Sequence, residues 1–150
     1  MTPETPTPPI SRSRQIERWT AIAMTLGLTP IAAYYAIGIL GLPIERLVDL
    51  DPTTRFDDVR RMISPVHVAA LILSGAGATA SLLLQILDSR WSLPAHILYF
   101  IGAKTGWIMA SFLANYDGLM VGAVTSIFQL SVLVILVRTQ GGKWFPQRRL

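Results

Sequence analysis

Residues 62–87 read MISPVHVAALILSGAGATASLLLQIL and contain no charged side chain over 26 positions. A helix that crosses about 30 Å of hydrocarbon needs about 20 predominantly apolar residues, because each residue adds about 1.5 Å. This stretch is long enough and apolar enough to do so. It therefore predicts a membrane-spanning helix.

Three further stretches have the same character. Residues 19–44 and 118–137 carry no charge, and residues 91–116 carry one charged side chain, that of Lys104. The last two connections are only a few residues long, which makes the second, third and fourth helices antiparallel neighbours. The fold class predicted is an all-α integral membrane protein, a four-transmembrane-helix bundle with short loops that forms one domain over residues 19–139.

Composition agrees with a lipid environment. Of the 150 residues, 51% are hydrophobic and only 15% are charged, whereas charged residues make up about 25% of soluble domains. The chain has no cysteine, which excludes disulfides, thiolate metal sites and cysteine nucleophiles.

Both ends of the chain differ from the spans. Residues 2–10 read TPETPTPPI, and so proline-rich a run has little to bury, so we expect residues 1–18 to form a disordered cytoplasmic tail. Gly141 and Gly142 predict a hinge, and residues 140–150 form a basic aromatic tail suited to a headgroup boundary. Within the first span, Pro30 predicts a break.

Basic residues flank the spans unequally. With four spans, one side of the membrane collects eight of them: Arg12, Arg14, Arg18, Arg90, Arg138, Lys143, Arg148 and Arg149. The other side has four, interleaved with acids: Arg46, Arg55, Arg60 and Arg61. Cytoplasmic segments hold the excess of lysine and arginine, so we expect a multi-pass protein of the plasma (inner) membrane with both termini cytoplasmic. Because these cations border apolar spans, their expected partners are membrane lipids and not nucleic acid.

The first connection has local structure of its own. Thr54 and Asp57 fit a helix cap, and Phe56, Val59 and Ile63 share a face, which predicts a short interfacial helix. The nearby aspartates lack the spacing of an EF-hand. His67 and His96 each lie a few residues inside the start of their spans, at opposite faces of the membrane, and cannot share a metal, so no metal or other cofactor is expected.

Lys104 is the most informative residue. It lies about twelve residues, or about 18 Å of helix, from either end of its span, near the bilayer midplane. A charge there costs about 2.5–3.5 kcal/mol, and no span contains a carboxylate. Three explanations stay open: the amine is neutral, it binds polar groups and water inside the bundle, or it meets an anionic ligand.

Three spans each present one polar stripe, and we expect these stripes to converge with Gln129 level with Lys104. Lys104, Ser111 and Asn115 share a line that Trp107 borders, while Ser74 and Gln85 share a face with His67 and Ser81. Gln129 lies on a face with Gly122, Thr125 and Ser126. The candidate midplane polar site comprises Lys104, Gln129, Trp107, Ser111, Asn115, Ser74 and Gln85.

Three functions fit these features. The first is an accessory or scaffold-type subunit of a larger membrane complex, or a homo-oligomer, held by polar and small-residue helix faces. The second is a small solute transporter or channel with a midplane site around Lys104. The third is a membrane-permeabilising, holin-like effector. The spans contain no phosphate loop, nucleophile elbow or paired carboxylates, so an enzyme is not expected.

Overall fold

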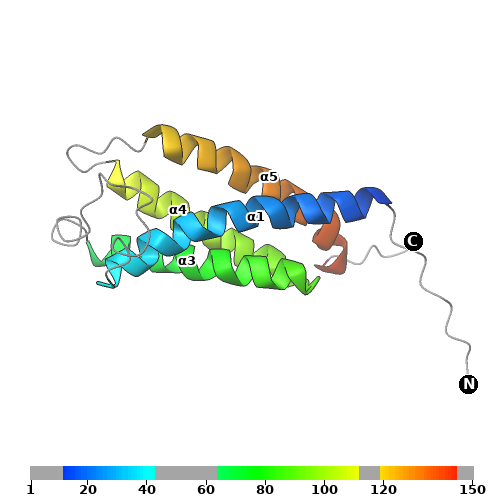
Figure 1. The fold of residues 1–150 in the computed structure, drawn as a ribbon, viewed down its shortest axis with the longest axis horizontal. Coiled ribbons are helices and arrows are strands. Elements are labelled where there is room, and N and C mark those ends of the chain that lie inside the picture. The colour runs from blue at the N-terminus through cyan, green and yellow to red at the C-terminus, as the bar shows by residue number, and fades with distance from the viewer. Residues whose placement is uncertain (1–11, 43–63, 112–118, 145–150) are drawn as a thin grey trace, which may run out of the picture.

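The computed structural model describes residues 12–42, 64–111 and 119–144. These residues form four helices and no strand: α1 (Arg12–Ile39), α3 (Pro65–Ile86), α4 (Ser92–Ala110) and α5 (Leu119–Trp144). Successive helices run in opposite directions and pack as a ring in which α1 contacts α3, α3 contacts α4, α4 contacts α5 and α5 contacts α1 (Figure 1). The predicted interfacial helix over 54–63 lies outside the described residues.

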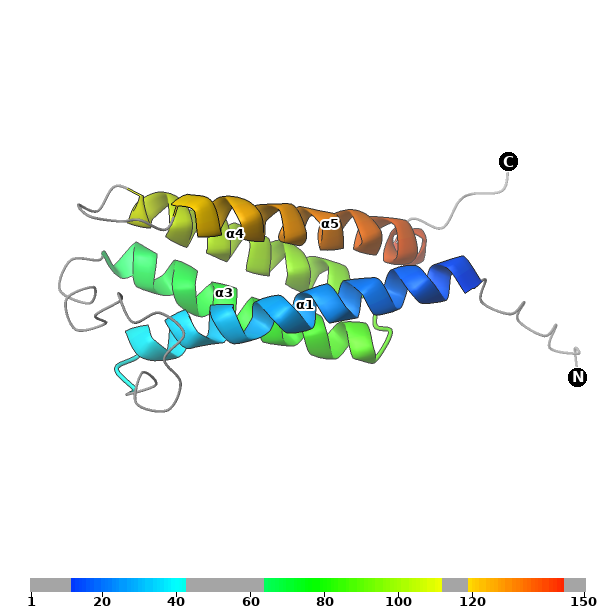
Figure 2. The same ribbon diagram turned by 45° about the horizontal axis from the view of Figure 1, so that its top comes forward.

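The helices α1, α3 and α5 are long and apolar enough to cross a membrane. The helix α4 has 19 residues but does not join this group, because Ser92, His96 and Lys104 lower its mean hydropathy. An all-helical protein with three candidate membrane spans is therefore confirmed. Figure 2 shows that the four helices share one long axis.

The beginning of α1 differs from the prediction, because the helix starts at Arg12, inside the expected tail 1–18. Contacts with neighbouring helices hold this first part in place. Glu17 pairs with Arg138 of α5 at 3.0 Å, and Arg18 Nη2 donates to the Ile86 carbonyl of α3 at 2.8 Å. Hydropathy does not register such contacts, so it placed the start too late.

The helix α1 also runs unbroken through Pro30, so the predicted break is wrong. Proline removes one backbone hydrogen bond, which a membrane helix tolerates when its neighbours support it. Here Gly75 of the neighbouring helix α3 lies against Ala32 and Ala36, in the turns that follow the proline.

At the other end of the chain, α5 continues through Gly141 and Gly142 to Trp144, so the expected hinge is absent and helix occupies the first part of the predicted tail 140–150. Gln140 explains this extension. Its side chain is buried and donates to the Asp88 carboxylate at 2.9 Å, beyond the end of α3. A buried side-chain contact of this kind outweighs the weak helix propensity of glycine.

Backbones approach each other most closely between α3 and α4. A Cβ at Gly77 would lie 2.8 Å from the Tyr99 nitrogen, and a Cβ at Gly102 would lie 2.8 Å from the Ala70 carbonyl oxygen. Glycine is required at both positions because any side chain would overlap the backbone of the facing helix. The two helices therefore form a tight antiparallel pair.

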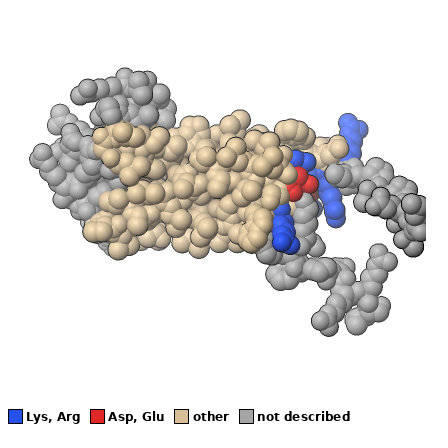
Figure 3. Space-filling view, turned by 90° about the horizontal axis from the view of Figure 1, so that it is seen from below, with Lys and Arg blue, Asp and Glu red and all other residues tan. Residues whose placement is uncertain are grey.

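Small side chains predominate inside the bundle, and large side chains cover its outside. Alanines such as Ala21 and Ala78 fill the interior with Tyr99 and Val132, whereas large apolar side chains face outward, as at Ile127, which is 65% exposed. Apart from Lys104, the charged side chains of the described residues gather at one end, as Figure 3 shows for one face of the molecule. An apolar belt that ends in charged side chains is the surface expected in lipid.

Candidate polar site in the bundle interior

A buried hydrogen-bond chain begins at Gln85 on α3. Its amide nitrogen Nε2 donates to Ser81 Oγ at 2.9 Å and to Thr25 Oγ1 of α1 at 3.0 Å. The Thr25 hydroxyl in turn donates to the Ala21 carbonyl of its own helix at 2.8 Å. One hydrogen of this amide therefore links α3 to α1, and the other bonds within α3.

His96 carries the chain to the other two helices. Its Nε2 lies 3.1 Å from the Gln129 carbonyl oxygen of α5, and its Nδ1 lies 3.1 Å from Ser81 Oγ of α3. A carbonyl oxygen can only accept, so Nε2 carries a hydrogen. In the neutral imidazole Nδ1 then accepts from the Ser81 hydroxyl, and the partners assign the tautomer.

These five residues, Thr25, Ser81, Gln85, His96 and Gln129, form what we call the interhelix network. Each is between 0% and 3% exposed. The network has a member on each of α1, α3, α4 and α5. Buried polar groups that are satisfied by neighbouring helices hold a membrane bundle together without help from water.

Lys104 lies apart from this network, between α4 and α5. Its amine donates to Ser126 Oγ at 2.5 Å, and Ser126 donates onward to the Gly122 carbonyl. The nitrogen also lies 5.6 Å from the centre of the Phe100 ring and 5.5 Å from that of Trp107. We call Lys104, Phe100, Trp107 and Ser126 the Lys104 cluster.

The amine of this cluster contacts one hydroxyl and two aromatic rings, groups that can stabilise a cation. Within the described residues no carboxylate lies within ion-pairing distance of the amine. The Trp107 indole packs on Gly122, where any Cβ would overlap it, and its buried Nε1 finds no acceptor in the part of the chain that the structure describes. The Lys104 amine and the Trp107 indole N–H are thus two neighbouring hydrogen-bond donors on α4. Among the described residues, the Ser126 hydroxyl of α5 accepts from the first of them.

The structure separates the candidate residues predicted from the sequence. Gln85 and Gln129 belong to the interhelix network, and Ser126, not Gln129, is the partner of Lys104. Ser74 is buried where α3 meets Gly102 of α4.

The remaining candidates take no part in either group or fall outside the description. Ser111 is exposed and donates to the Trp107 carbonyl of its own helix at 2.8 Å. Asn115 lies outside the described residues.

Two members of the interhelix network, Thr25 and His96, were missed by sequence reasoning. Ser92, His96, Tyr99 and Ala103 recur at positions i, i+4, i+7 and i+11, a spacing that marks one helix face. This face is centred about 110° away from Lys104, and it packs into the bundle, with Ser92 and His96 both 0% exposed. The spacing of these four residues therefore indicated a buried face, but the predicted site was built around Lys104 and did not include it.

Comparisons of the chain with models of protein families, with curated proteins and with solved structures found no match. The proposal for a function therefore rests on the interhelix network, the Lys104 cluster and the surface.

Proposed function

We propose that this chain is a four-span protein of the plasma (inner) membrane, with both termini in the cytoplasm, that acts as an accessory or scaffold-type subunit or as a homo-oligomer. The interhelix network carries this proposal. It commits buried polar side chains of α1, α3 and α4 and the Gln129 backbone carbonyl of α5 to contacts among themselves, the arrangement of a packed structural bundle and not of an open solute path.

The geometry of α4 supports a fourth span. A helix of 19 residues is about 28 Å long, close to the thickness of the hydrocarbon layer. Ser92 and His96 are fully buried in the bundle and Lys104 is half-buried, while Ile97, Ile101 and Ile108 are 40–51% exposed on the outside. Neighbouring helices thus shield Ser92 and His96, two of the three side chains that lower the mean hydropathy of α4.

Charge supports the orientation. Five arginines of the described chain lie at or near one end of the bundle: Arg12, Arg14, Arg18, Arg90 and Arg138. Only two described acids, Glu17 and Asp88, accompany them. An excess of arginine marks the cytoplasmic side.

Lys104 supports association with a second chain. It is half-buried, and Ser126 and the two rings solvate its charge without neutralising it. A carboxylate from a neighbouring subunit would supply the missing charge. A charged group at this depth otherwise costs about 2.5–3.5 kcal/mol.

The test is purification in mild detergent, with size-exclusion light scattering for the mass of the particle and mass spectrometry for co-purifying proteins. Lys104→Met is expected to lose the partner or the oligomer while the monomer stays folded, because Ser126 keeps its bond to Gly122. Lys104→Arg, which retains charge and donors, is the matched control and should keep the complex. A wild-type protein that is monomeric and free of partners would contradict the proposal.

A second candidate function is a transporter or channel for a small anionic or polar solute at the Lys104 cluster. The buried Trp107 N–H beside the lysine amine favours it, since two donors could share one acceptor of a solute. Here Lys104→Met should abolish uptake into proteoliposomes but leave the particle mass unchanged. Loss of cell viability on expression would instead favour the permeabilising alternative.

A further inference from the structure

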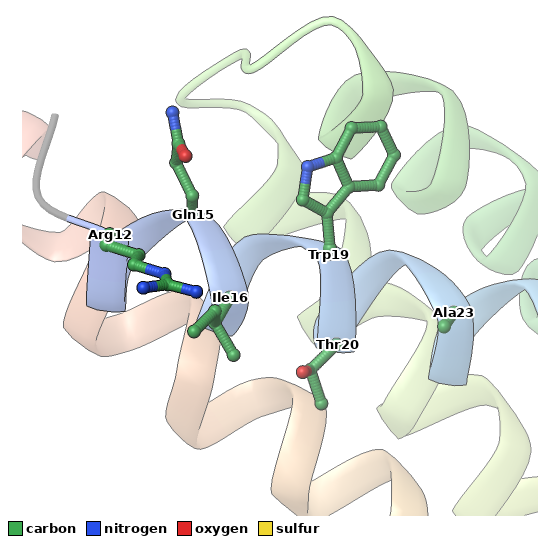
Figure 4. Close-up of a pocket in the computed structure, with 6 residues that line it drawn as sticks. All are labelled: Arg12, Gln15, Ile16, Trp19, Thr20 and Ala23. Carbon is green, nitrogen blue, oxygen red and sulfur yellow. The ribbon is translucent and has the colours of Figure 1, made fainter.

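A pocket of about 470 Å³ lies along the first three turns of α1 (Figure 4). All its described lining residues come from this one helix: Arg12, Gln15, Ile16, Trp19, Thr20 and Ala23. They recur every three or four positions, so they share one face. Gln15 and Trp19 project to one side of that face and Ile16 and Thr20 to the other (Figure 4).

The chemistry of this face changes with depth. Arg12 and Gln15 lie at the charged end of the bundle, and Trp19 and Ala23 lie farther toward its apolar middle. Seven residues separate Arg12 from Trp19, which is about 10 Å of helix. This length matches the passage from the phosphate level to the first acyl carbons, where tryptophan is enriched.

Arg12 differs from its neighbours in having no hydrogen bond or ion pair within the described residues. Arg18 is bound to carbonyl oxygens at the end of α3, and Arg138 is paired with Glu17. Glu17 itself lies about 140° around α1 from Arg12, so it does not repel an anion in the pocket. A free guanidinium binds phosphate oxygens through two parallel hydrogen bonds.

From this charge complementarity we infer that the pocket binds one anionic phospholipid. Arg12 holds the phosphate, Gln15 and Thr20 offer hydrogen bonds to the headgroup and glycerol oxygens, and the first part of an acyl chain lies against Ile16, Trp19 and Ala23. The site is independent of the Lys104 cluster and of the proposed function.

The experiment is native mass spectrometry of the purified protein titrated with phosphatidylglycerol or with phosphatidylcholine of the same acyl chains. The wild type should retain one phosphatidylglycerol in preference to phosphatidylcholine. Arg12→Gln should weaken phosphatidylglycerol binding about fivefold, the effect of one cation beside an anionic lipid. Arg14→Gln removes the same charge about 160° around the helix and is the matched control, which should retain the lipid.

Three outcomes would overturn the inference. Equal losses from Arg12→Gln and Arg14→Gln would reduce the effect to general attraction between charges, and no loss from Arg12→Gln would show that Arg12 does not hold the lipid. Full binding by Trp19→Ala, together with displacement of the lipid by inorganic phosphate, would assign the pocket to a free anion. Both arginines and Trp19 are exposed, so the variants should fold, which circular dichroism checks.

Discussion

His96 is the residue through which three helices of the bundle are joined. Its two ring nitrogens contact Ser81 of α3 and the Gln129 carbonyl of α5, and the ring also lies edge-on to Tyr99 at 5.4 Å between centroids. The ring is 0% exposed, so no water can replace these partners. Its contribution should therefore be visible in the stability of the whole bundle.

We expect His96→Leu to lower the free energy of unfolding by about 1–3 kcal/mol, since two interhelical hydrogen bonds of about 0.6–1.7 kcal/mol each are lost. Unfolding by SDS in mixed micelles, followed by circular dichroism, measures the change. Ser131→Ala is the control, because Ser131 is exposed and bonds only to the Ile127 carbonyl of its own helix. Equal effects of the two variants would mean that the network does not hold the bundle.

At this scale the sequence predicted types of residue better than pairs of residues. The spacing of His67, Ser74, Ser81 and Gln85 predicted one polar face of α3, and all four are buried. The partners could not be read in the same way, because they depend on the crossing of helices far apart in the chain. Thr25 of α1 and His96 of α4 meet this face from different helices.

Among the elements, the α3–α4 pair depends on two glycines. At Gly77 an added methyl group would meet the Tyr99 backbone at 2.8–2.9 Å, and backbone cannot move aside as a side chain can. Gly27 of α1 offers the contrast, because a methyl group added there would meet nothing within 4 Å.

We expect Gly77→Ala to lower the free energy of unfolding by about 1–3 kcal/mol, the usual cost of overpacking. Gly27→Ala should be neutral or raise it by up to about 1 kcal/mol, because alanine is the better helix former. The same unfolding titration compares the two variants. A tolerated Gly77→Ala would show that α3 and α4 are not in backbone contact.

Element boundaries depended on contacts that hydropathy cannot register. The cores of all four helices fall inside the apolar stretches 19–44, 62–87, 91–116 and 118–137. The extensions beyond them, at the beginning of α1 and the end of α5, are held by Arg18, Glu17 and Gln140. Polar tertiary contacts, and not local propensity, determine where these helices begin and end.

Within the residues that the structure describes, one end of the molecule is charged and the other end carries no charge. Apart from Lys104, the charged side chains of these residues lie near the beginnings of α1 and α4 and the ends of α3 and α5. The four described helices alternate in direction, so the beginning of α1 and the end of α5 both lie at this end. The proposed cytoplasmic location of the termini follows from the positive-inside rule.

We expect fluorescent-protein fusions at either terminus to fluoresce in the cytoplasm of a bacterial host. Alkaline phosphatase inserted between α1 and α3 should be active, because this enzyme matures only after export. An active phosphatase at either terminus, together with an inactive one between α1 and α3, would show that the orientation is the opposite one. If only one terminus were cytoplasmic, the number of spans would be odd, and α4 would lie outside the membrane.

The glycine contacts between α3 and α4 also bear on how the protein is made. The two helices are neighbours in the chain, joined by a short turn in which Asp88 takes the left-handed backbone conformation at φ 51°. If α4 spans the membrane as proposed, the two helices can leave the translocon as a hairpin, and α5 then docks against this pair. Biogenesis would then be most vulnerable during synthesis of the middle of the chain, before the last helix exists.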